Sequence, residues 1–177
     1  MLWWLPTFFI LSSLRSTAAQ AQASCLPFYS WASNSQNQSP CQVAASLLTV
    51  CNGSPFPVLP LPANSEYLGP TLQDANPCQC NTVTYSLMSA CGACQGQDYV
   101  SWSVWTTNCA TVYGNIFPEP IPSGVSVPGW AYLDVEAEGN FDQTNAKNNI
   151  SRHLLQYRPR QAQLHRHLPL YPPNRPK

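Results

Sequence analysis

The chain lacks positive charge over most of its length. Charged residues make up only 9% of its 177 residues, and residues 24–146 contain no Lys, Arg or His although they hold all eight acidic residues. This segment is therefore formally −8. Because nucleic acids are bound through clustered cations, we expect no nucleic-acid partner. The missing His, Lys and Arg also exclude a Ser-His-Asp or Cys-His catalytic arrangement within the segment.

An enzyme built from residues 24–146 would have to use a pair of carboxylates, as glycosidases do. No spacing among the acidic residues favours one such pair. The three histidines, His153, His165 and His167, all lie in the C-terminal segment. We therefore predict a non-enzymatic protein with no catalytic residues, no bound metal and no cofactor, and we keep a wall-active glycosidase as the third hypothesis.

The chain also lacks an apolar run long enough to cross a membrane as a helix, which takes about 20 residues. The run from Leu2 to Leu11 is followed by small and polar residues that end in Ala-Gln-Ala-Gln-Ala. This pattern is typical of a signal peptide, which we place at residues 1–23, with cleavage after Ala21 or Ala23. The mature protein is thus expected to be secreted or exposed at the extracellular face of the cell surface.

Cysteine, in contrast, is abundant, and every cysteine follows the predicted cleavage sites. The eight are Cys25, Cys41, Cys51, Cys78, Cys80, Cys91, Cys94 and Cys109. An even number in a secreted chain predicts disulfides. Eight cysteines can pair in 105 ways, so the connectivity stays open. A zinc site formed by Cys78, Cys80, Cys91 and Cys94 is the alternative, although it would suit the cytosol better.

Helical spacing connects these cysteines. Ser39 and Pro40 form a helix start ahead of the stripe Cys41, Ala44, Leu47, Leu48 and Cys51, and Gly53 follows as a stop. A second stripe contains Cys80, Val83, Leu87, Cys91 and Cys94, with Asn81 or Asn76 as the cap. A third, short helix is expected after Ser101, with Trp102, Trp105 and Cys109 on one face.

The remaining segments are predicted to be less regular. Prolines between residues 55 and 77 favour an irregular loop, and the alternation from Trp130 to Glu138 favours a β-strand. Residues 147–177 are basic and proline-rich, which predicts disorder. The expected fold is a small, disulfide-rich, mainly α domain at residues 24–146 with three short helices, proline-rich irregular loops and one β-strand near residues 130–138.

Two motifs resemble reactive or metal-binding sites. Cys91-Gly92-Ala93-Cys94 has the spacing of a redox pair, but it closes the C-terminal end of its helix, where the dipole disfavours a thiolate. We interpret it as structural. Acidic residues from Asp134 to Asp142 follow the spacing of a calcium loop, but position twelve is Asn145 instead of Glu, which favours a solvated acidic turn.

Sequons and aromatic residues suggest surface features. Asn37, Asn52 and Asn149 each begin an Asn-x-Ser sequon and are predicted glycosylation sites; a proline directly follows each of the first two sequons, which disfavours their use. Six aromatic residues are expected mainly in the core, with an exposed platform for sugars as the alternative. They are Phe28, Tyr29, Trp31, Trp102, Trp105 and Tyr113.

The cysteine-rich segment contains the motifs Ser39-Pro-Cys-Gln-Val-Ala-Ala, Val50-Cys-Asn-Gly, Tyr67-Leu-Gly-Pro, Cys78-Gln-Cys-Asn-Thr-Val-Thr-Tyr-Ser-Leu, Trp102-Ser-Val-Trp and Pro118-Glu-Pro-Ile-Pro. Through these motifs, about residues 25–145 resemble a group of uncharacterised surface proteins of mushroom-forming fungi. In that group a secreted cysteine-rich domain precedes a Ser/Thr-rich stalk and one membrane span. The resemblance implies a surface ectodomain, although the expected span is absent after Lys147 in this chain.

A second resemblance is to fungal CFEM domains, which also have eight cysteines with the fourth and fifth as Cys-x-Cys. Some of them bind haem through an Asp just ahead of that pair, and Asp74 stands four residues before Cys78. The spacings from Cys25 to Cys41 and from Cys51 to Cys78 are longer here. The first hypothesis is therefore a surface module that contacts cell-wall polysaccharide or surface proteins, and a CFEM-like haem or iron binder with Asp74 as ligand is the second.

Overall fold

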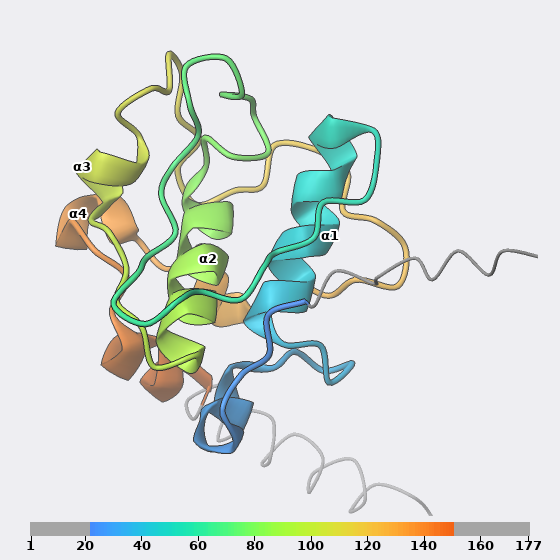
Figure 1. The fold of residues 1–177 in the computed structure, drawn as a ribbon, viewed down its shortest axis with the longest axis vertical. Coiled ribbons are helices and arrows are strands. Elements are labelled where there is room, and N and C mark those ends of the chain that lie inside the picture. The colour runs from blue at the N-terminus through green and yellow to red at the C-terminus, as the bar shows by residue number, and fades with distance from the viewer. Residues whose placement is uncertain (1–21, 151–177) are drawn as a thin grey trace, which may run out of the picture.

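The computed structural model describes residues 22–150, and these residues form a mainly helical, disulfide-rich domain. The predicted signal peptide, apart from residues 22 and 23, and residues 151–177 of the predicted tail lie outside this range. The elements are η1 (Pro27–Ala32), α1 (Pro40–Asn52), α2 (Thr82–Cys94), α3 (Trp102–Trp105), η2 (Gly129–Tyr132) and α4 (Val135–Glu138), and residues 143–150 are also helical (Figure 1). The predicted mainly α class is thus confirmed.

The predicted β-strand near residues 130–138 is wrong, and residues 22–150 contain no strand. Pro128 precedes the turn η2, and the Asp134 side chain caps α4 by accepting hydrogen bonds from the amides of Glu136 and Ala137. The buried residues of this segment, Trp130, Ala131 and Val135, do not alternate. The cap that Asp134 provides therefore outweighs the alternating apolar pattern, and the segment forms helical turns instead of a strand.

Helix α1 begins and ends where the sequence predicts. Ser39 accepts a hydrogen bond from the amide of Gln42, whose side chain accepts one from the Ser39 amide, so the two residues form a capping box with Pro40 in the first turn. Gly53 ends the helix with a φ of 65°, a left-handed conformation that glycine adopts without steric cost. Four members of the predicted stripe, Cys41, Ala44, Leu47 and Leu48, are buried, as is Val43, whereas the fifth member, Cys51, is half-buried.

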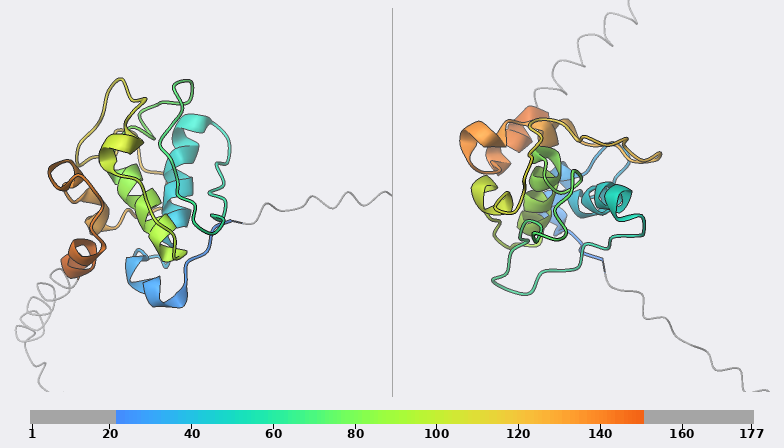
Figure 2. Two further views of the ribbon diagram at one scale, coloured as in Figure 1. Left: turned by 60° about the vertical axis from the view of Figure 1, so that its left-hand side comes forward. Right: turned by 90° about the horizontal axis from the view of Figure 1, so that it is seen from above.

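Helix α2 is the centre of the domain. Asn81 caps it, as one of the two predicted caps, and all 13 residues of the helix are buried. The sequence predicted one buried face, whereas α2 contacts α1, α3, η2 and α4. Figures 1 and 2 show α1 antiparallel to α2 on one side and the C-terminal segments on the other. Helix α2 can be buried on all sides because none of its side chains is charged.

Four disulfides hold the segments around these helices. They are Cys25–Cys94, Cys41–Cys91, Cys51–Cys78 and Cys80–Cys109, and no cysteine is free. Cys41–Cys91 lies at the start of α1 and Cys51–Cys78 at its end, so the two bridges hold both ends of the helix. The predicted disulfides are therefore present, with a connectivity that the sequence left open.

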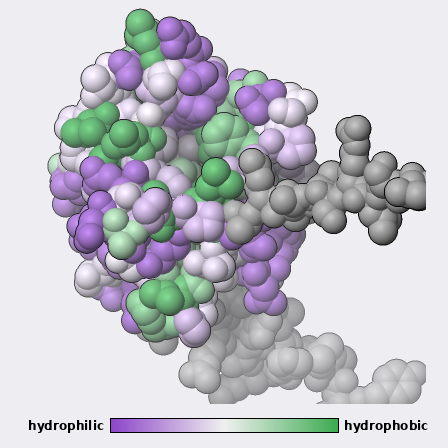
Figure 3. All heavy atoms as spheres, in the orientation of Figure 1, coloured by the Kyte–Doolittle hydropathy of each residue, from purple (hydrophilic) through white to green (hydrophobic). Residues whose placement is uncertain are grey.

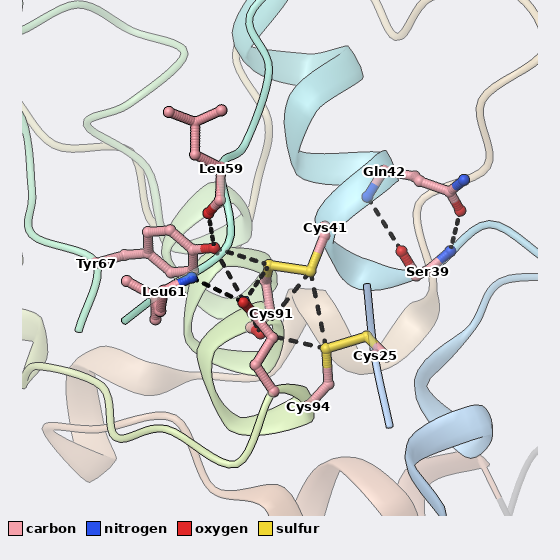
Figure 4. Close-up of a disulfide and its surroundings, with 10 residues drawn as sticks. Cys25, Ser39, Cys41, Gln42, Leu59, Leu61, Tyr67, Cys91 and Cys94 are labelled. Atoms are coloured by element: carbon pink, nitrogen blue, oxygen red, sulfur yellow. Dashed lines mark hydrogen bonds between the residues drawn. A yellow bond between two sulfur atoms is a disulfide. The ribbon is translucent and has the colours of Figure 1, made fainter. Parts of the chain in front are cut away.

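The proline-rich loop is irregular, as predicted, and side chains fix it to the C-terminal end of α2. The Tyr67 hydroxyl donates to the Leu59 carbonyl at 2.6 Å, and the Gln95 side chain donates to the Tyr67 hydroxyl and accepts from the Leu61 amide (Figure 4). These bonds replace the backbone partners that a regular element would supply.

Both ends of the described range belong to the folded part. Ala23 is 4% exposed and its amide donates to the Val58 carbonyl at 2.8 Å, so cleavage after Ala21 keeps contacts that cleavage after Ala23 would remove. Residues 147–150 continue the helix that begins at residue 143, so the first four residues of the segment predicted as disordered are helical.

Candidate binding site

A pocket of about 550 Å³ lies between the C-terminal end of α1 and the loop of residues 68–79. Both lie at the upper end of the molecule in Figure 1. Its lining combines amide, hydroxyl and apolar groups: Leu48, Asn52, Phe56, Leu68, Gly69, Pro70, Thr71, Gln73, Asp74, Ala75, Asn76, Gln79, Met88 and Trp105. Volumes of this size accommodate small organic ligands.

Three contacts fix the walls of this pocket. The Cys51–Cys78 disulfide joins the last turn of α1 to the end of the 68–79 loop. The Trp105 indole donates to the Gln79 carbonyl at 2.9 Å, and the Asn108 amide donates to the Pro70 carbonyl at 2.9 Å. Because each contact joins segments that are distant in sequence, the pocket is preformed instead of depending on a single loop.

Gly69 allows the loop to approach α3 closely. A Cβ atom at this position would lie 1.8 Å from the carbonyl oxygen of Trp105. This distance is far inside van der Waals contact, so any side chain would push the loop away from α3. The close approach places Leu68 and Pro70 in the pocket wall.

The chemistry of the lining fits a neutral polyhydroxyl ligand. Asn52, Gln73, Asn76 and Gln79 can both donate and accept hydrogen bonds, as sugar hydroxyls do. Leu48, Phe56, Leu68 and Met88 offer apolar contacts for the C–H faces of a sugar ring. In Figure 3 the apolar residues of the visible face are scattered among hydrophilic ones, without one broad apolar band.

Asp74 lines the pocket but does not fit a haem ligand. It lies in an exposed turn, and its carboxylate accepts a hydrogen bond of 2.6 Å from the Thr71 hydroxyl. The side-chain amides of Gln73 and Gln79 also line the pocket and have no hydrogen-bond partner among residues 22–150, and the apolar face of a porphyrin would offer them none. Burying amides against such a surface without hydrogen-bond partners is costly, so the pocket does not match that group. Asp74 is also the sole acid that lines it, whereas glycosidases need two.

The three predicted glycosylation sites occupy different surroundings. Asn52 is exposed, ends α1 and lines the pocket. Asn37 is exposed in a turn with a φ of 58°, close to the start of α1. Asn149 is half-buried beside a second cavity, of about 430 Å³, that Trp130 also lines. The structure thus brings Asn52 and Asp74 to one pocket and leaves Asn37 at the opposite end of α1.

The Cys91–Cys94 motif contains two separate bridges and no dithiol. Cys91 is bonded to Cys41 and Cys94 to Cys25, and the two bridges lie against each other with 3.8 Å between the Cys41 and Cys94 sulfurs (Figure 4). The sulfurs of Cys25, Cys41 and Cys94 lie within 4.8 Å of one another. Because all of them are oxidised, none is the thiolate that a metal would need. Cys78 and Cys80, which the alternative zinc site would need, are likewise in disulfides, as predicted for all the cysteines.

The acidic residues that follow calcium-loop spacing cap helices instead. Asp134 accepts from two amides at the start of α4, and Asp142 accepts from the amides of Thr144 and Asn145 at the start of the last helix. Gly139 ends α4 in the left-handed conformation. The predicted solvated acidic turn therefore contains two helix caps, a role that the spacing alone did not indicate.

Most of the aromatic residues singled out in the sequence belong to the core. Trp102, Trp105 and Tyr29 are at most 9% exposed, and Trp31 and Tyr113 are half-buried. Phe28 is 70% exposed, and it alone of the six is fully at the surface. A platform of several exposed aromatic rings is therefore not formed by these residues.

Burial also affects four tyrosines. Desolvation raises the pKa values of the hydroxyls of Tyr29, Tyr67, Tyr85 and Tyr132. For Tyr29, the nearby Tyr99 hydroxyl raises the pKa further. The Tyr85 hydroxyl donates to the Val100 carbonyl and accepts from the Phe141 amide, whereas the buried Tyr29 hydroxyl has no partner among the described residues.

Comparison with known proteins gives no relative: no protein-family model, no curated protein and no solved structure matches this chain. Within residues 22–150, none of the helices combines the length and apolar character needed to cross a membrane. The functional interpretation therefore depends on the pocket and on the residues around it.

Proposed function

We propose that this chain is a non-enzymatic, secreted or cell-surface ectodomain of a fungus that binds neutral cell-wall polysaccharide. The mixed lining of the pocket between α1 and the 68–79 loop is the observation that carries this proposal. Amides at Asn52, Asn76 and Gln79 suit hydroxyl groups, while Phe56 and Met88 suit sugar C–H faces. Four disulfides suit an oxidising extracellular compartment.

Charge supports a neutral ligand over an anionic one. Residues 24–146 have eight acids and no Lys, Arg or His, so an anionic polysaccharide would be repelled. A single acid in the pocket also argues for binding over hydrolysis, because glycosidases use two carboxylates.

Titration with soluble oligosaccharides tests the proposal. We expect chitin or β-1,3-glucan hexamers to bind and to remain intact, and we expect Gln79→Ala to weaken binding while the fold persists. Ser46→Ala, which changes a half-buried side chain of α1 that does not line this pocket, is the control. Absence of binding to any neutral wall polysaccharide would contradict the proposal, and so would release of shortened sugars.

A haem- or iron-binding surface protein is the second candidate, because Asp74 lines this same pocket. The hydrogen bond from Thr71 and the surrounding amides weigh against it. We expect no Soret band when haemin is added. A band that disappears in Asp74→Ala would replace the saccharide proposal with this one.

A further inference from the structure

We propose that an N-linked glycan on Asn52 occupies the pocket and closes it to external saccharides, so that glycosylation regulates binding. This inference rests on the proposed function for its biological meaning. The contact between the glycan and the pocket can be measured without any external ligand.

The position of Asn52 carries the first step. Asn52 is the last residue of α1, is exposed and lines the pocket. Its amide nitrogen, the atom to which a glycan is attached, donates to the Ser54 hydroxyl at 3.1 Å. A glycosylated amide keeps one N–H group, so this bond can persist and hold the attachment point at the edge of the pocket.

The anchoring of α1 carries the second step. Cys51 precedes Asn52 and is bonded to Cys78 at the end of the 68–79 loop. Gly53 then turns the chain away in the left-handed conformation. The attachment point is therefore fixed relative to the loop that carries Asn76 and Gln79, which line the same pocket as Asn52, so a glycan attached there is tethered at this pocket.

Tethering makes this internal sugar a strong competitor. A ligand joined to its site by a short flexible link has an effective concentration on the order of millimolar. An external wall saccharide would have to displace it. The first sugars of the glycan are neutral and polyhydroxylated, so they suit the amides and apolar groups that we assign to saccharide binding.

The sequence also predicts a mixture of two forms. Pro55 directly follows the Asn52-Gly53-Ser54 sequon, which disfavours full modification. A secreted population would then contain closed molecules with the glycan and open molecules without it. The ratio of the two forms would set the binding capacity of the population.

The experiment compares the full-length wild type, Ser54→Ala and Asn37→Gln after secretion from a eukaryotic host. Ser54→Ala removes the Asn52 sequon and leaves the Asn52 side chain in the pocket wall. Asn37 is a matched control, because it is an exposed sequon at the other end of α1, a helix of 13 residues and thus about 20 Å long. Mass spectrometry gives the occupancy at Asn52. Hydrogen–deuterium exchange of residues 68–79 reports whether the glycan covers the pocket.

We expect modified Asn52, slower exchange of residues 68–79 in the glycosylated wild type and in Asn37→Gln, and faster exchange in Ser54→Ala. We expect glucan or chitin hexamers to bind Ser54→Ala about tenfold more tightly than the glycosylated form. Unmodified Asn52, or equal exchange in all three proteins, would overturn the inference. If exchange differs but no hexamer binds, the proposed function fails and the glycan contact stands. If hexamers bind all three proteins with equal affinity, the proposed function stands and regulation by the glycan is overturned.

Discussion

At the scale of single residues, Gly69 and Asn81 hold the backbone in place, one by close packing and the other by hydrogen bonds. Gly69 packs against the backbone of Trp105, and Asn81 is fully buried at the start of α2. The Asn81 side chain accepts from the Thr84 amide and donates to the carbonyls of Pro77 and Cys78. One asparagine therefore both caps the central helix and holds the chain that enters it.

Replacing Gly69 by Ala should destabilise the domain and open the pocket. The new Cβ would lie 1.8 Å from the Trp105 carbonyl oxygen, so the backbone must shift, at a cost of about 2–3 kcal/mol. Gly124→Ala is the control: its φ of 77° costs about 1 kcal/mol, but no atom lies within 4 Å of the added Cβ. Urea unfolding and saccharide titration should show loss of binding for Gly69→Ala alone. Retained affinity in that variant would contradict the assigned wall.

Replacing Asn81 by Ala should cost about 2–4 kcal/mol of unfolding free energy, because a helix cap is lost and two buried carbonyls lose a donor. Ser101→Ala removes one cap bond of 3.3 Å from the Val104 amide and an exposed bond of 3.0 Å between the Ser101 and Ser103 hydroxyls, and it should cost about 1 kcal/mol or less. Asn81→Asp keeps the acceptor and should lie between wild type and Asn81→Ala. The check is urea unfolding with the disulfides intact, and similar losses for Asn81→Ala and Ser101→Ala would refute this ranking.

At the scale of elements, the local signals in the sequence identify α1 and α2 well. Ser39, Pro40 and Gly53 bound α1, and Asn81 caps α2, because caps act on neighbouring residues and can be read from a short stretch of chain. The segment from Trp130 to Glu138 shows the limit of such patterns. There the alternation of apolar residues favoured a strand, but Asp134 initiates a helix.

The pocket could not be predicted in the same way. Its walls come from α1, the 68–79 loop and Trp105, and the contacts between them are long-range. Asp74 and Asn52 were singled out for separate reasons, haem and glycan, and only folding places them at one site. Gly69 and Gln79 were missed, although the Gly69-Pro70 dipeptide is a turn signal at this point of the chain.

Removing the Cys51–Cys78 bridge should separate stability from binding. With both cysteines changed to Ser, the disulfide no longer restricts the unfolded chain over a sequence separation of 27 residues. The chain-entropy model then predicts a loss of about 3.5 kcal/mol in unfolding free energy. Loss of Cys25–Cys94, which spans 69 residues, should cost about 4.4 kcal/mol but leave the pocket intact, since this bridge lies at the other end of α2. We therefore expect weaker saccharide binding in the less destabilised variant. Titration and urea unfolding check this, and equal binding by both variants would argue against the bridge as a wall.

At the scale of the whole molecule, the domain combines a small core, four disulfides and, within residues 24–146, charged side chains of one sign. Residues 24–146 carry acids alone, and burial of uncharged helix α2 removes the need for buried ion pairs. Small domains of this kind gain stability from disulfides when the core is limited. Burial raises the pKa values of four tyrosine hydroxyls, which predicts a loss of stability at alkaline pH.

Burial raises the pKa values of Tyr29, Tyr67, Tyr85 and Tyr132 above their usual value of 10.0. Above about pH 10 these hydroxyls ionise in the unfolded chain while they stay protonated in the folded one, so unfolding releases protons and stability falls as pH rises. Below that pH their contribution is fully present and does not vary. Each tyrosine can add a slope of at most about 1.4 kcal/mol per pH unit.

Urea unfolding from about pH 7 to pH 11 should therefore show a decline that begins near pH 10. Tyr29→Phe should reduce the decline and should not destabilise the protein at neutral pH, because the buried Tyr29 hydroxyl has no hydrogen-bond partner among residues 22–150. Tyr85→Phe should also reduce the decline, but it should destabilise the protein at neutral pH, because the Val100 carbonyl and the Phe141 amide lose their partner. Unfolding that is equally pH-dependent in wild type and Tyr29→Phe would show that this hydroxyl is not protected from ionisation in the folded domain.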